Sequence, residues 1–548
     1  MTEEKSDLAF LPLGGTGEIG MNLNLYRLDG KWLAVDCGIG FGGAELPEVD
    51  IMVPDPGFIA ERRADLVGLV ITHAHEDHIG AVAWLWQQLR CQLVCTPFAA
   101  AVLRRKLGEH NLLGQVKINV VPPGASFKIG SFDLRFLPMT HSVPESQALV
   151  LRTRYGNILH TGDWKLDPGP MVGPLSDEAS LAALGREGVL AMVCDSTNAL
   201  VDGHSGSEAT VRQELATLVK TIKGRIAVTC FASNVARVES IALAGLAAGR
   251  SVALVGRSLR NMDAAARECG YFKTLPPFLS EDAAEEMADN QILMITTGSQ
   301  GEPRSALARI AADTHPAIAL GEGDTVIFSS RVIPGNERAI HAVQDNLVRR
   351  GVDLISADQY PVHCSGHPAR EELRKLYDLV KPKYSVPTHG EWRHLQAHAD
   401  LARECGAAPL LLEDVDILRL APGVVEVVDS APVGRLVVDG DRLLPLKGGV
   451  MAARRRILFN GVVVASIAVD QAGQVRGVPK ISAPGLFENE DAEAERVARD
   501  FLVGVEQISP AIVRDDALFA EAARAVLRRA LGKKLQKRPM VELHLIRV

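Results

Sequence analysis

Three histidines and two acidic residues fall within six positions of the chain, in the stretch HAHEDH at residues 73–78. The stretch follows the apolar run LVGLVI, with only Thr72 between them. In a loop that leaves a strand, His73 and His75 can point to one metal ion while Asp77 and His78 point to a second. Imidazole nitrogen together with carboxylate oxygen suits zinc and related divalent ions. The spacing differs from the helical HExxH arrangement, in which two histidines four residues apart bind a single metal.

A site for two metals needs further ligands, and other predicted strand ends supply them. His141 comes after the run LRFLPM, His160 and Asp163 come after the run GNIL, and His389 comes after YSVP. Ligands are commonly held at such strand-to-loop positions by a rigid scaffold. A single histidine is more often an ordinary core or surface residue, but HxHxDH with these partners favours a metal-dependent hydrolase.

Apolar runs that alternate with helical patterns must position these residues. The strand-like runs are WLAVDCG, LVGLVITH, RIAVTCFAS, SVALVG, ILMITTGS and TVIFSS. This alternation is typical of α/β layers. The segments GGTGEIGMNLNLYRLDG and FKIGSFDLRFLPMTH favour an antiparallel meander instead. Near the end, KGGVMAARRR predicts a linker, residues 456–477 predict a strand, a turn and a second strand, and VELHLIRV predicts a last strand after long helices.

Composition limits the class of protein. A chain of 548 residues is long enough for several domains, and its 47% hydrophobic and 23% charged content is that of a globular protein. The net charge of −8 does not indicate nucleic-acid binding by itself, although basic residues gather at 454–456 and 524–539. The longest apolar runs are too short to span a membrane. Eight scattered cysteines predict reduced thiols and a cytoplasmic localisation.

A series of short motifs runs in order along the whole chain: GGTGEIGMN, THAHEDHIGA, TGDWKLD, CDSTN, FASNVARV, TTGSQGEP, IPGNE, HCSGHP, PTHGEWRHL and KKLQKRPM. In these motifs the sequence resembles the ribonuclease J family, in the β-CASP branch of the metallo-β-lactamase superfamily. The resemblance implies an α/β fold: a metallo-β-lactamase αββα sandwich, an inserted β-CASP α/β domain and a small C-terminal α+β domain. The expected boundaries are 1–205 and 371–445 for the two parts of the sandwich, 206–370 for the insertion, 446–455 for the linker and 456–548 for the last domain.

The resemblance also implies two Zn²⁺ per subunit, which Mn²⁺ or Mg²⁺ could replace in vitro. Two such ions can activate a water molecule and clamp a phosphodiester. His160 has no place in the ligand set and is expected to be a buried strand histidine. The implied ligands are His73, His75 and His141 for one ion and Asp77, His78 and His389 for the other, with Asp163 bridging both.

Asp195 in CDSTN and His367 in HCSGHP resemble the additional motifs of the branch. A carboxylate next to an imidazole orients it and raises its pKa, so His367 is predicted to protonate the leaving 3′-oxygen. Asp77, Asp195 and His367 are therefore the predicted catalytic residues. The alternative for Asp195 is a turn or helix cap.

The resemblance implies that two loops together hold a substrate 5′-phosphate. In FASNVARV a strand meets a helix, where exposed N–H groups and the helix dipole favour an anion. HCSGHP forms the second loop. Each loop alone is a weak signal, because small polar residues cap many helices. The predicted substrate-binding residues are Ser233, Asn234, Val235, His363, Cys364, Ser365, Gly366 and His367.

The function that the resemblance implies is zinc-dependent hydrolysis of single-stranded RNA in rRNA processing and mRNA decay. The expected activity is 5′→3′ exonuclease with a preference for 5′-monophosphate ends, plus endonuclease. Expected partners are RNA, copies of the same chain in a homodimer or homotetramer, and an RNA helicase or other degradosome components, without a membrane. One alternative is a DNA nuclease of the same branch, which His389 disfavours because those proteins typically have valine there. A second is a small-molecule hydrolase, although such enzymes are shorter. A third is a catalytically weak RNA-binding subunit, which the intact ligand positions disfavour.

Overall fold

The computed structural model describes residues 7–43, 46, 49–432 and 434–548. The chain divides into two compact units. The first reaches Arg435, and the second comprises Leu436–Val548 with a short segment near residue 50.

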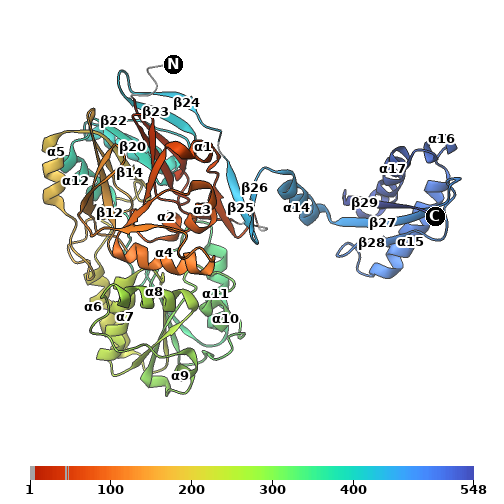
Figure 1. The fold of residues 1–548 in the computed structure, drawn as a ribbon. Coiled ribbons are helices and arrows are strands. Elements are labelled where there is room, and N and C mark those ends of the chain that lie inside the picture. Colours follow the sequence, from red (N-terminus) through yellow and green to blue (C-terminus); the bar gives the residue numbers. More distant parts are fainter. Residues whose placement is uncertain (1–6, 44–45, 47–48, 433) are drawn as a thin grey trace. The chain divides into compact units, whose positions relative to one another are not determined.

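Two sheets form the centre of the first unit (Figure 1). One contains, in spatial order, β24 (Glu426–Ser430), β23 (Asp416–Ala421), β1 (Leu8–Gly14), β3 (Leu23–Leu28), β4 (Lys31–Val35), β7 (Leu66–Val70), β8 (Leu93–Cys95) and β9 (Ile118–Val120). The other contains β10 (Ser126–Ile129), β11 (Phe132–Pro138), β12 (Gln147–Thr153), β13 (Gly156–His160), β14 (Val189–Asp195), β20 (Tyr384–Thr388) and β22 (Ala408–Pro409). The predicted antiparallel meanders are confirmed in β1–β3–β4 and in β10 to β13, whereas β13, β14 and β20 run parallel.

The two sheets pack face to face. In β12, Leu149 and Leu151 enter the core between the sheets, while Ala148 and Val150 enter the core under helices on the other face. This alternation follows from the two-residue period of a strand, and burial on both faces explains why residues 148–151 of the strand are all apolar. The helices on that outer face are α5 (Glu178–Glu187), α12 (Arg370–Val380) and α13 (Trp392–Glu404). With α3 (Val82–Leu89) and α4 (Pro97–Glu109) beside the first sheet, the layers make the predicted αββα sandwich (Figure 1).

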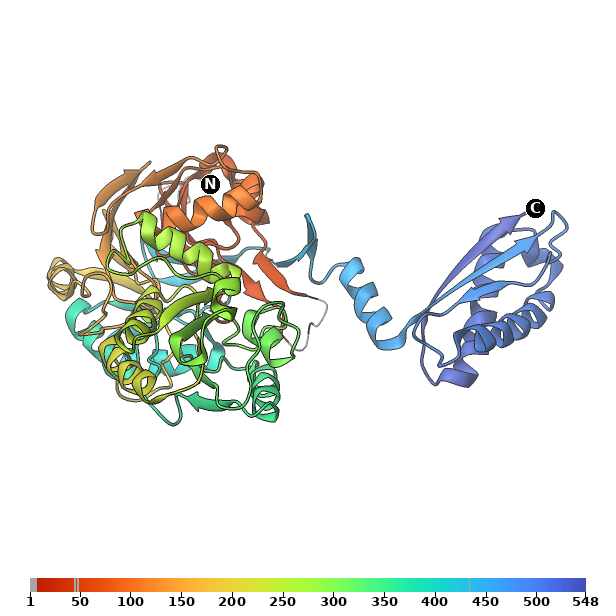
Figure 2. The ribbon, with the colours of Figure 1, turned by 90° about the horizontal axis from the view of Figure 1, so that it is seen from below.

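Between β14 and β20 the chain builds a further α/β part with its own sheet, yellow to green in Figures 1 and 2. Its sheet is wholly parallel, in the order β16 (Ser251–Val255), β17 (Ile292–Thr296), β15 (Ile226–Thr229), β18 (Thr325–Phe328) and β19 (Asp353–Ser356). Because the strands are parallel, the loops after β17, β15 and β18 leave from the same edge, where ligands bind in open α/β sheets. The accompanying helices include α6 (Glu208–Thr221), α7 (Val235–Ala247), α8 (Arg257–Glu268), α10 (Ala306–Ala311) and α11 (Glu337–Arg349).

The second unit has its own core. In its main sheet, β27 (Val462–Val469) lies between β28 (Lys480–Ser482) and β29 (Met540–Arg547). Phe501 of α15 (Glu490–Glu506) and Phe519 and Leu527 of α17 (Asp516–Leu535) are fully buried against this sheet. The unit is therefore α+β, and β29 is the predicted last strand.

One prediction for this region is wrong. The start of the predicted strand, residues 456–460, lies instead in a helix, α14 (Gly449–Asn460), and the strand begins only at Val462. Met, Ala, Arg and Leu are good helix formers, and Gly461, with φ of 82°, ends the helix. The second predicted strand is reduced to a single bridge between Val469 and Val475.

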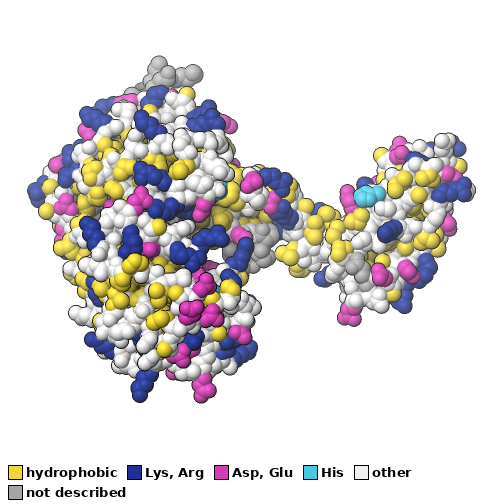
Figure 3. All heavy atoms as spheres, turned by 60° about the horizontal axis from the view of Figure 1, so that its bottom comes forward, with side chains coloured by type: hydrophobic (Ala, Val, Ile, Leu, Met, Phe, Trp, Pro, Cys, Tyr) yellow, Lys and Arg dark blue, Asp and Glu magenta, His cyan; other side chains and the backbone are white. Residues whose placement is uncertain are grey.

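Charged side chains of both signs are interspersed over the face drawn in Figure 3. Among the residues that the structure describes, no helix combines the length and the apolar content needed to cross a bilayer.

Candidate metal centre

The structure brings the seven predicted ligands together at one end of the sandwich. They lie in the loops after β7, β11, β13 and β20, and in α2 (Glu76–Ile79), the first helix after β7. Two groups of four have ligand atoms within 4.8 Å of one another. These groups are His73, His75, His141 and Asp163, and Asp77, His78, Asp163 and His389.

The first group is arranged around one point. His75 Nδ1 lies 3.2 Å from His73 Nε2 and 3.0 Å from His141 Nε2. Asp163 Oδ2 lies 3.7 Å from His73 Nε2 and 3.8 Å from His141 Nε2. A tetrahedral zinc ion with Zn–N bonds of about 2.0–2.1 Å separates its nitrogen ligands by about 3.3 Å. The donor set therefore fits a divalent cation.

The second group shares a carboxylate with the first. Asp163 Oδ2 lies 3.2 Å from His78 Nε2, and Asp77 Oδ2 lies 3.0 Å from His389 Nε2. The other oxygen of Asp163 is buried without a hydrogen bond among the described residues. Asp163 is thus placed to bind on both sides.

The imidazoles are held from behind. A metal-binding histidine usually uses its second nitrogen to contact a carboxylate, carbonyl or hydroxyl group, which sets the orientation of the ring. Four of the five histidines have such a partner within 3.0 Å. The pairs are His78 Nδ1 with Asp36 Oδ2 (2.8 Å), His141 Nδ1 with the Gly366 carbonyl (2.6 Å), His389 Nδ1 with Thr197 Oγ1 (2.9 Å) and His73 Nδ1 with Thr72 Oγ1 (3.0 Å).

Sequence reasoning missed the partners Asp36 and Thr197. Asp36 follows β4 in the motif WLAVDCG, is fully buried and has φ of 62°. Its carboxylate also accepts hydrogen bonds from the amide and hydroxyl of Thr72. An acidic residue at the end of a buried strand was the signal available. His160, by contrast, is confirmed as a buried strand residue, with Nδ1 2.9 Å from the hydroxyl of Tyr26.

Burial sets the protonation of the first group. It lowers the pKa of His75 to about 4. Burial, aided by the neighbouring His78 and His75, also lowers the pKa of His73. Burial would raise the pKa of Asp163, but His389 and His78 together bring it well below its usual range. Neutral imidazole and ionised carboxylate are the forms that bind a metal.

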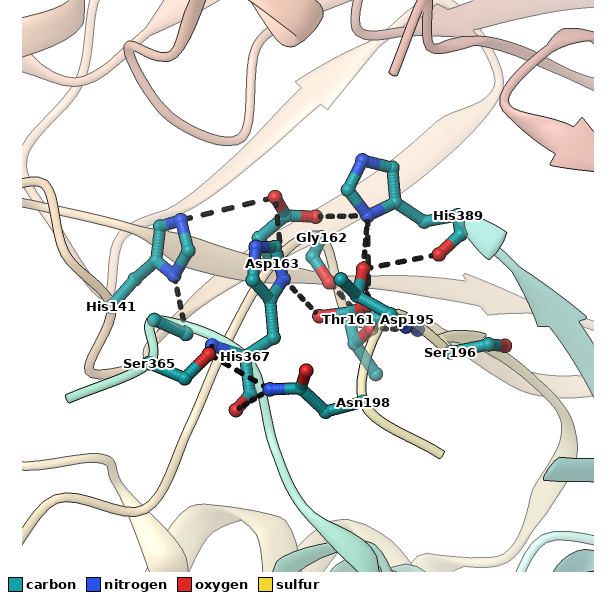
Figure 4. A network of polar contacts seen from close by, with 12 residues as sticks. His141, Thr161, Gly162, Asp163, Asp195, Ser196, Asn198, Ser365, His367 and His389 are labelled. Atoms are coloured by element: carbon teal, nitrogen blue, oxygen red, sulfur yellow. Dashed lines mark hydrogen bonds and ion pairs between the residues drawn. The ribbon is translucent and has the colours of Figure 1, made fainter. Parts of the chain in front are cut away.

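The predicted pair of Asp195 and His367 lies beside the ligands (Figure 4). His367 Nδ1 is 2.8 Å from Asp195 Oδ2. The other carboxylate oxygen accepts from the amide and hydroxyl of Thr197, at 2.8 and 2.7 Å. Asp195 therefore both caps a turn and orients an imidazole. Burial disfavours the charged form of His367, but Asp195 and Asp163 raise its pKa above the ordinary value.

The HCSGHP loop closes over the first ligand group. A Cβ atom on Gly366 would lie 2.9 Å from Cε1 of His141, so the close approach of the loop requires glycine. Asn198, at the end of the CDSTN motif, donates from Nδ2 to Ser365 Oγ at 2.8 Å and to the His367 carbonyl at 3.0 Å (Figure 4). Asn198 was not singled out from the sequence.

The FASN loop is held differently from the expectation. The side chain of Asn234 caps α7 by accepting from the amide of Arg237 at 2.9 Å, and its Nδ2 donates to Glu208 at 3.1 Å. Val235 is buried, with its amide bonded to the Ser233 carbonyl. Ser233 is the third predicted residue of this loop. Its side-chain hydroxyl makes no hydrogen bond to the described part of the chain.

Buried ion pairs fasten this loop to HCSGHP. Arg237 is paired with Glu208 at 2.8 Å and also donates to the Val362 carbonyl at 3.2 Å. Lys165 is paired with Asp167 at 2.9 Å.

The remaining predicted pocket residues, His363 and Cys364, lie against these cations. Lys165 Nζ is 3.5 Å from Cys364 Sγ. Burial and the neighbouring Arg237 lower the pKa of His363 to about 3. The two side chains therefore present a neutral imidazole and a buried thiol.

Comparison with known protein families gives four matches in chain order. The metallo-beta-lactamase superfamily matches residues 20–220, and the beta-CASP domain of ribonuclease J matches residues 223–347. A Zn-dependent metallo-hydrolase RNA specificity domain matches residues 355–415, and the ribonuclease J C-terminal domain matches residues 449–548. These matches confirm the expected fold class.

Whole-length relatives agree. Ribonuclease J of Sinorhizobium meliloti is 42% identical, over 100% of this chain and 98% of the relative. Ribonuclease J of Mycolicibacterium smegmatis is 38% identical, over 96% and 95% of the two chains. A solved structure of a protein of unknown function from Enterococcus faecalis V583 superposes with a TM-score of 0.54 at 18% identity, covering 76% of this chain and 100% of that one, and shares the fold.

Proposed function

Because this chain belongs to the ribonuclease J family of metal-dependent ribonucleases, we propose that it hydrolyses single-stranded RNA with two bound Zn²⁺ ions. It acts as a 5′→3′ exonuclease that prefers 5′-monophosphate ends, and it also cleaves internally. Its cellular role is RNA maturation and decay in the cytoplasm. It works as a homodimer or homotetramer, with an RNA helicase or other degradosome components as further partners.

The observation that carries the proposal is the pair of donor groups joined by Asp163, with His367 next to them. All seven ligands carry the side chains that such a centre needs, which argues against a subunit that has lost its metals. The seven ligands supply the cation sites, and His367, oriented by Asp195, supplies a proton donor.

When bound, two divalent cations supply Lewis acidity, which activates water and offsets the charge of the phosphodiester. The chain supplies the rest. Asp195 holds Nδ1 of His367, which leaves Nε2 to donate a proton to the leaving 3′-oxygen. Asp77, at the open side of the centre with 26% of its side chain exposed, faces the substrate as well as a cation.

The exonuclease step needs the RNA end held at a fixed distance from the cations. The hydroxyls of Ser233 and Ser365 and the neutral ring of His363 bind the terminal phosphate, and Asn198 keeps Ser365 and His367 in one rigid loop. Holding the 5′ end in this way orients the first linkage for attack.

One gel tests the proposal. The same RNA with a 5′-triphosphate, 5′-monophosphate or 5′-hydroxyl end is incubated with the protein, with and without a chelator, beside single-stranded DNA of the same sequence. We expect mononucleotides mainly from the monophosphorylated RNA and none with chelator. Equal or faster degradation of DNA would contradict the proposal, and so would activity that survives complete metal removal.

A further inference from the structure

The proposed phosphate pocket, as described so far, contains no positively charged side chain that is free to pair with the phosphate. A terminal phosphate monoester carries between one and two negative charges at neutral pH. Ser233, Ser365 and His363 offer hydroxyls and a neutral ring, and no cation. The two cations buried behind them, Arg237 and Lys165, are already paired with carboxylates at 2.8 and 2.9 Å.

Arg331 lies at the same edge of the inserted sheet. Phe328 at the end of β18 is paired in register with Thr229 at the end of β15, so the loops after these strands are neighbours. One loop carries Ser233 and the other carries Arg331. Arg331 is exposed, whereas Arg237 is fully buried.

Hydrogen bonds fix Arg331 relative to the pocket. Its Nη1 donates to Oδ1 of Asn198 at 2.9 Å, while Nδ2 of the same amide donates to Ser365 at 2.8 Å. Its backbone carbonyl accepts from the side chain of Gln300 at 2.8 Å. The guanidinium and the serine hydroxyl therefore lie on the two sides of one side-chain amide. The charge of Arg331 is also among those that disfavour a protonated His363.

We propose that Arg331 is the cation that recognises the 5′-phosphate, and that Asn198 is the positioning residue that aims it. The contact to Asn198 uses one N–H group, and no other side-chain partner of Arg331 is found among the described residues. The remaining N–H groups of the planar guanidinium can donate two parallel hydrogen bonds to two phosphate oxygens. A lysine ammonium group cannot make this bidentate contact. This inference rests on the proposed preference for 5′-monophosphate ends and names the residue that creates it.

The test compares kcat/KM for two RNAs of one sequence, with a 5′-monophosphate or a 5′-hydroxyl end. We expect Arg331→Gln to lose about 10- to 100-fold more on the monophosphate RNA than on the hydroxyl RNA, because a charge-assisted contact is removed from one substrate alone. Arg331→Lys keeps the charge without the fork and should lose less. Bound metal, measured on each variant, should equal that of the wild type.

Arg349→Gln is the matched control. Arg349 is exposed at the last residue of α11, which runs back from the edge carrying Arg331 to the opposite edge of the sheet. The Arg349→Gln substitution makes the same change of charge and should keep the wild-type ratio of kcat/KM between the two RNAs. Equal losses on both RNAs in Arg331→Gln, or no loss, would overturn the assignment. A wild-type enzyme that does not distinguish the two ends would instead overturn the proposed function, and this result is read without any variant.

Discussion

The proposed function gives two histidines in the centre different tasks, although both lie near Asp163. His78 is 2% exposed and its Nδ1 is held by Asp36, so its inward nitrogen is committed to a cation. His367 has 22% of its side chain exposed and its Nδ1 is held by Asp195, so in the proposed function its other nitrogen faces the substrate. The carboxylate behind each ring decides which atom is available, and each task can be tested separately.

His367→Ala should lower kcat by about 10²- to 10⁴-fold, because a positioned proton donor contributes that much to a difficult leaving group. Bound metal should be unchanged. A nucleotide p-nitrophenyl ester, whose leaving group departs without a proton, should be cleaved by the variant almost as fast as by the wild type. An equal loss on both substrates would assign His367 to binding or structure instead of proton donation.

Asp36→Asn should weaken metal binding by about 10- to 100-fold, the usual cost of removing the partner of a metal-bound histidine. Metal retained per chain after dialysis against graded chelator measures the effect. Asp29→Asn is the control, since Asp29 is a partly exposed carboxylate paired with Arg154. Metal retention equal to that of the control would mean that Asp36 does not hold the site.

The clustering of the seven candidate ligands could be predicted, because histidine is a rare residue type that recurs here after apolar runs, and the resemblance supplied the full set. Thr197 and Asn198 could not, because their importance comes from contacts across the fold, and for Asp36 the available signal was an acidic residue at the end of an apolar run. Asn198 meets the His367 carbonyl 169 residues later in the chain, and the two meet only because β14 and β20 are neighbours in one sheet. A polar residue after a strand is too common to signal such a contact.

Helices α6 and α7 are joined by an almost fully buried charge pair between Glu208 and Arg237. Glu208 is 2% exposed and accepts from Arg237 and from Asn234 of the FASN loop. The pair therefore fixes the loop that carries Ser233. Its cost in lost hydration is offset because Arg237 also donates to the carbonyls of Ser329 and Val362.

This pair predicts a pH-dependent stability. Burial would raise the pKa of Glu208, but Arg237 more than offsets it and brings the pKa from 4.5 to about 2. The folded state thus keeps the carboxylate ionised where the unfolded chain takes up a proton. The stabilisation, about 3 kcal/mol, is fully present above pH 4.5 and is lost as the pH falls from about 4.5 towards about 2.

Glu208→Gln should lower the free energy of unfolding at pH 7 by about 3–5 kcal/mol, because Arg237 is left buried without its partner. Urea unfolding at pH 7 and below pH 4.5 should show the gap to the wild type narrowing as the pH falls. Glu239→Gln, which removes a partly exposed carboxylate paired with Arg212, should cost less. A gap that stays constant with pH would contradict the assigned pair.

Where the element predictions failed, local signals competed. The segment 449–460 contains an arginine run that suits a linker and the apolar ILF that suits a strand, yet it forms one helix. Its residues favour a helix individually, and Gly461 supplies the stop, so periodicity over such a short stretch could not decide. The strand that follows, β27, alternates buried and half-buried residues and was predictable.

The two units have separate hydrophobic cores, and the metal centre belongs to the first alone. A ligand that binds only the folded state stabilises the unit that contains its site, by an amount that grows with the logarithm of free ligand over Kd. Metal removal should therefore lower the stability of one unit and leave the other as it was.

Tryptophan fluorescence allows the unfolding of the first unit to be followed separately. All five, at positions 32, 84, 86, 164 and 392, lie in the first unit, so their fluorescence reports its unfolding, whereas calorimetry reports both. We expect chelator to shift the fluorescence transition to lower temperature together with one calorimetric transition, while a second transition stays in place. Restoring zinc should reverse the shift. If both transitions moved together, the units would be coupled more tightly than their separate cores imply, because the second unit has no ligand in either group of the centre.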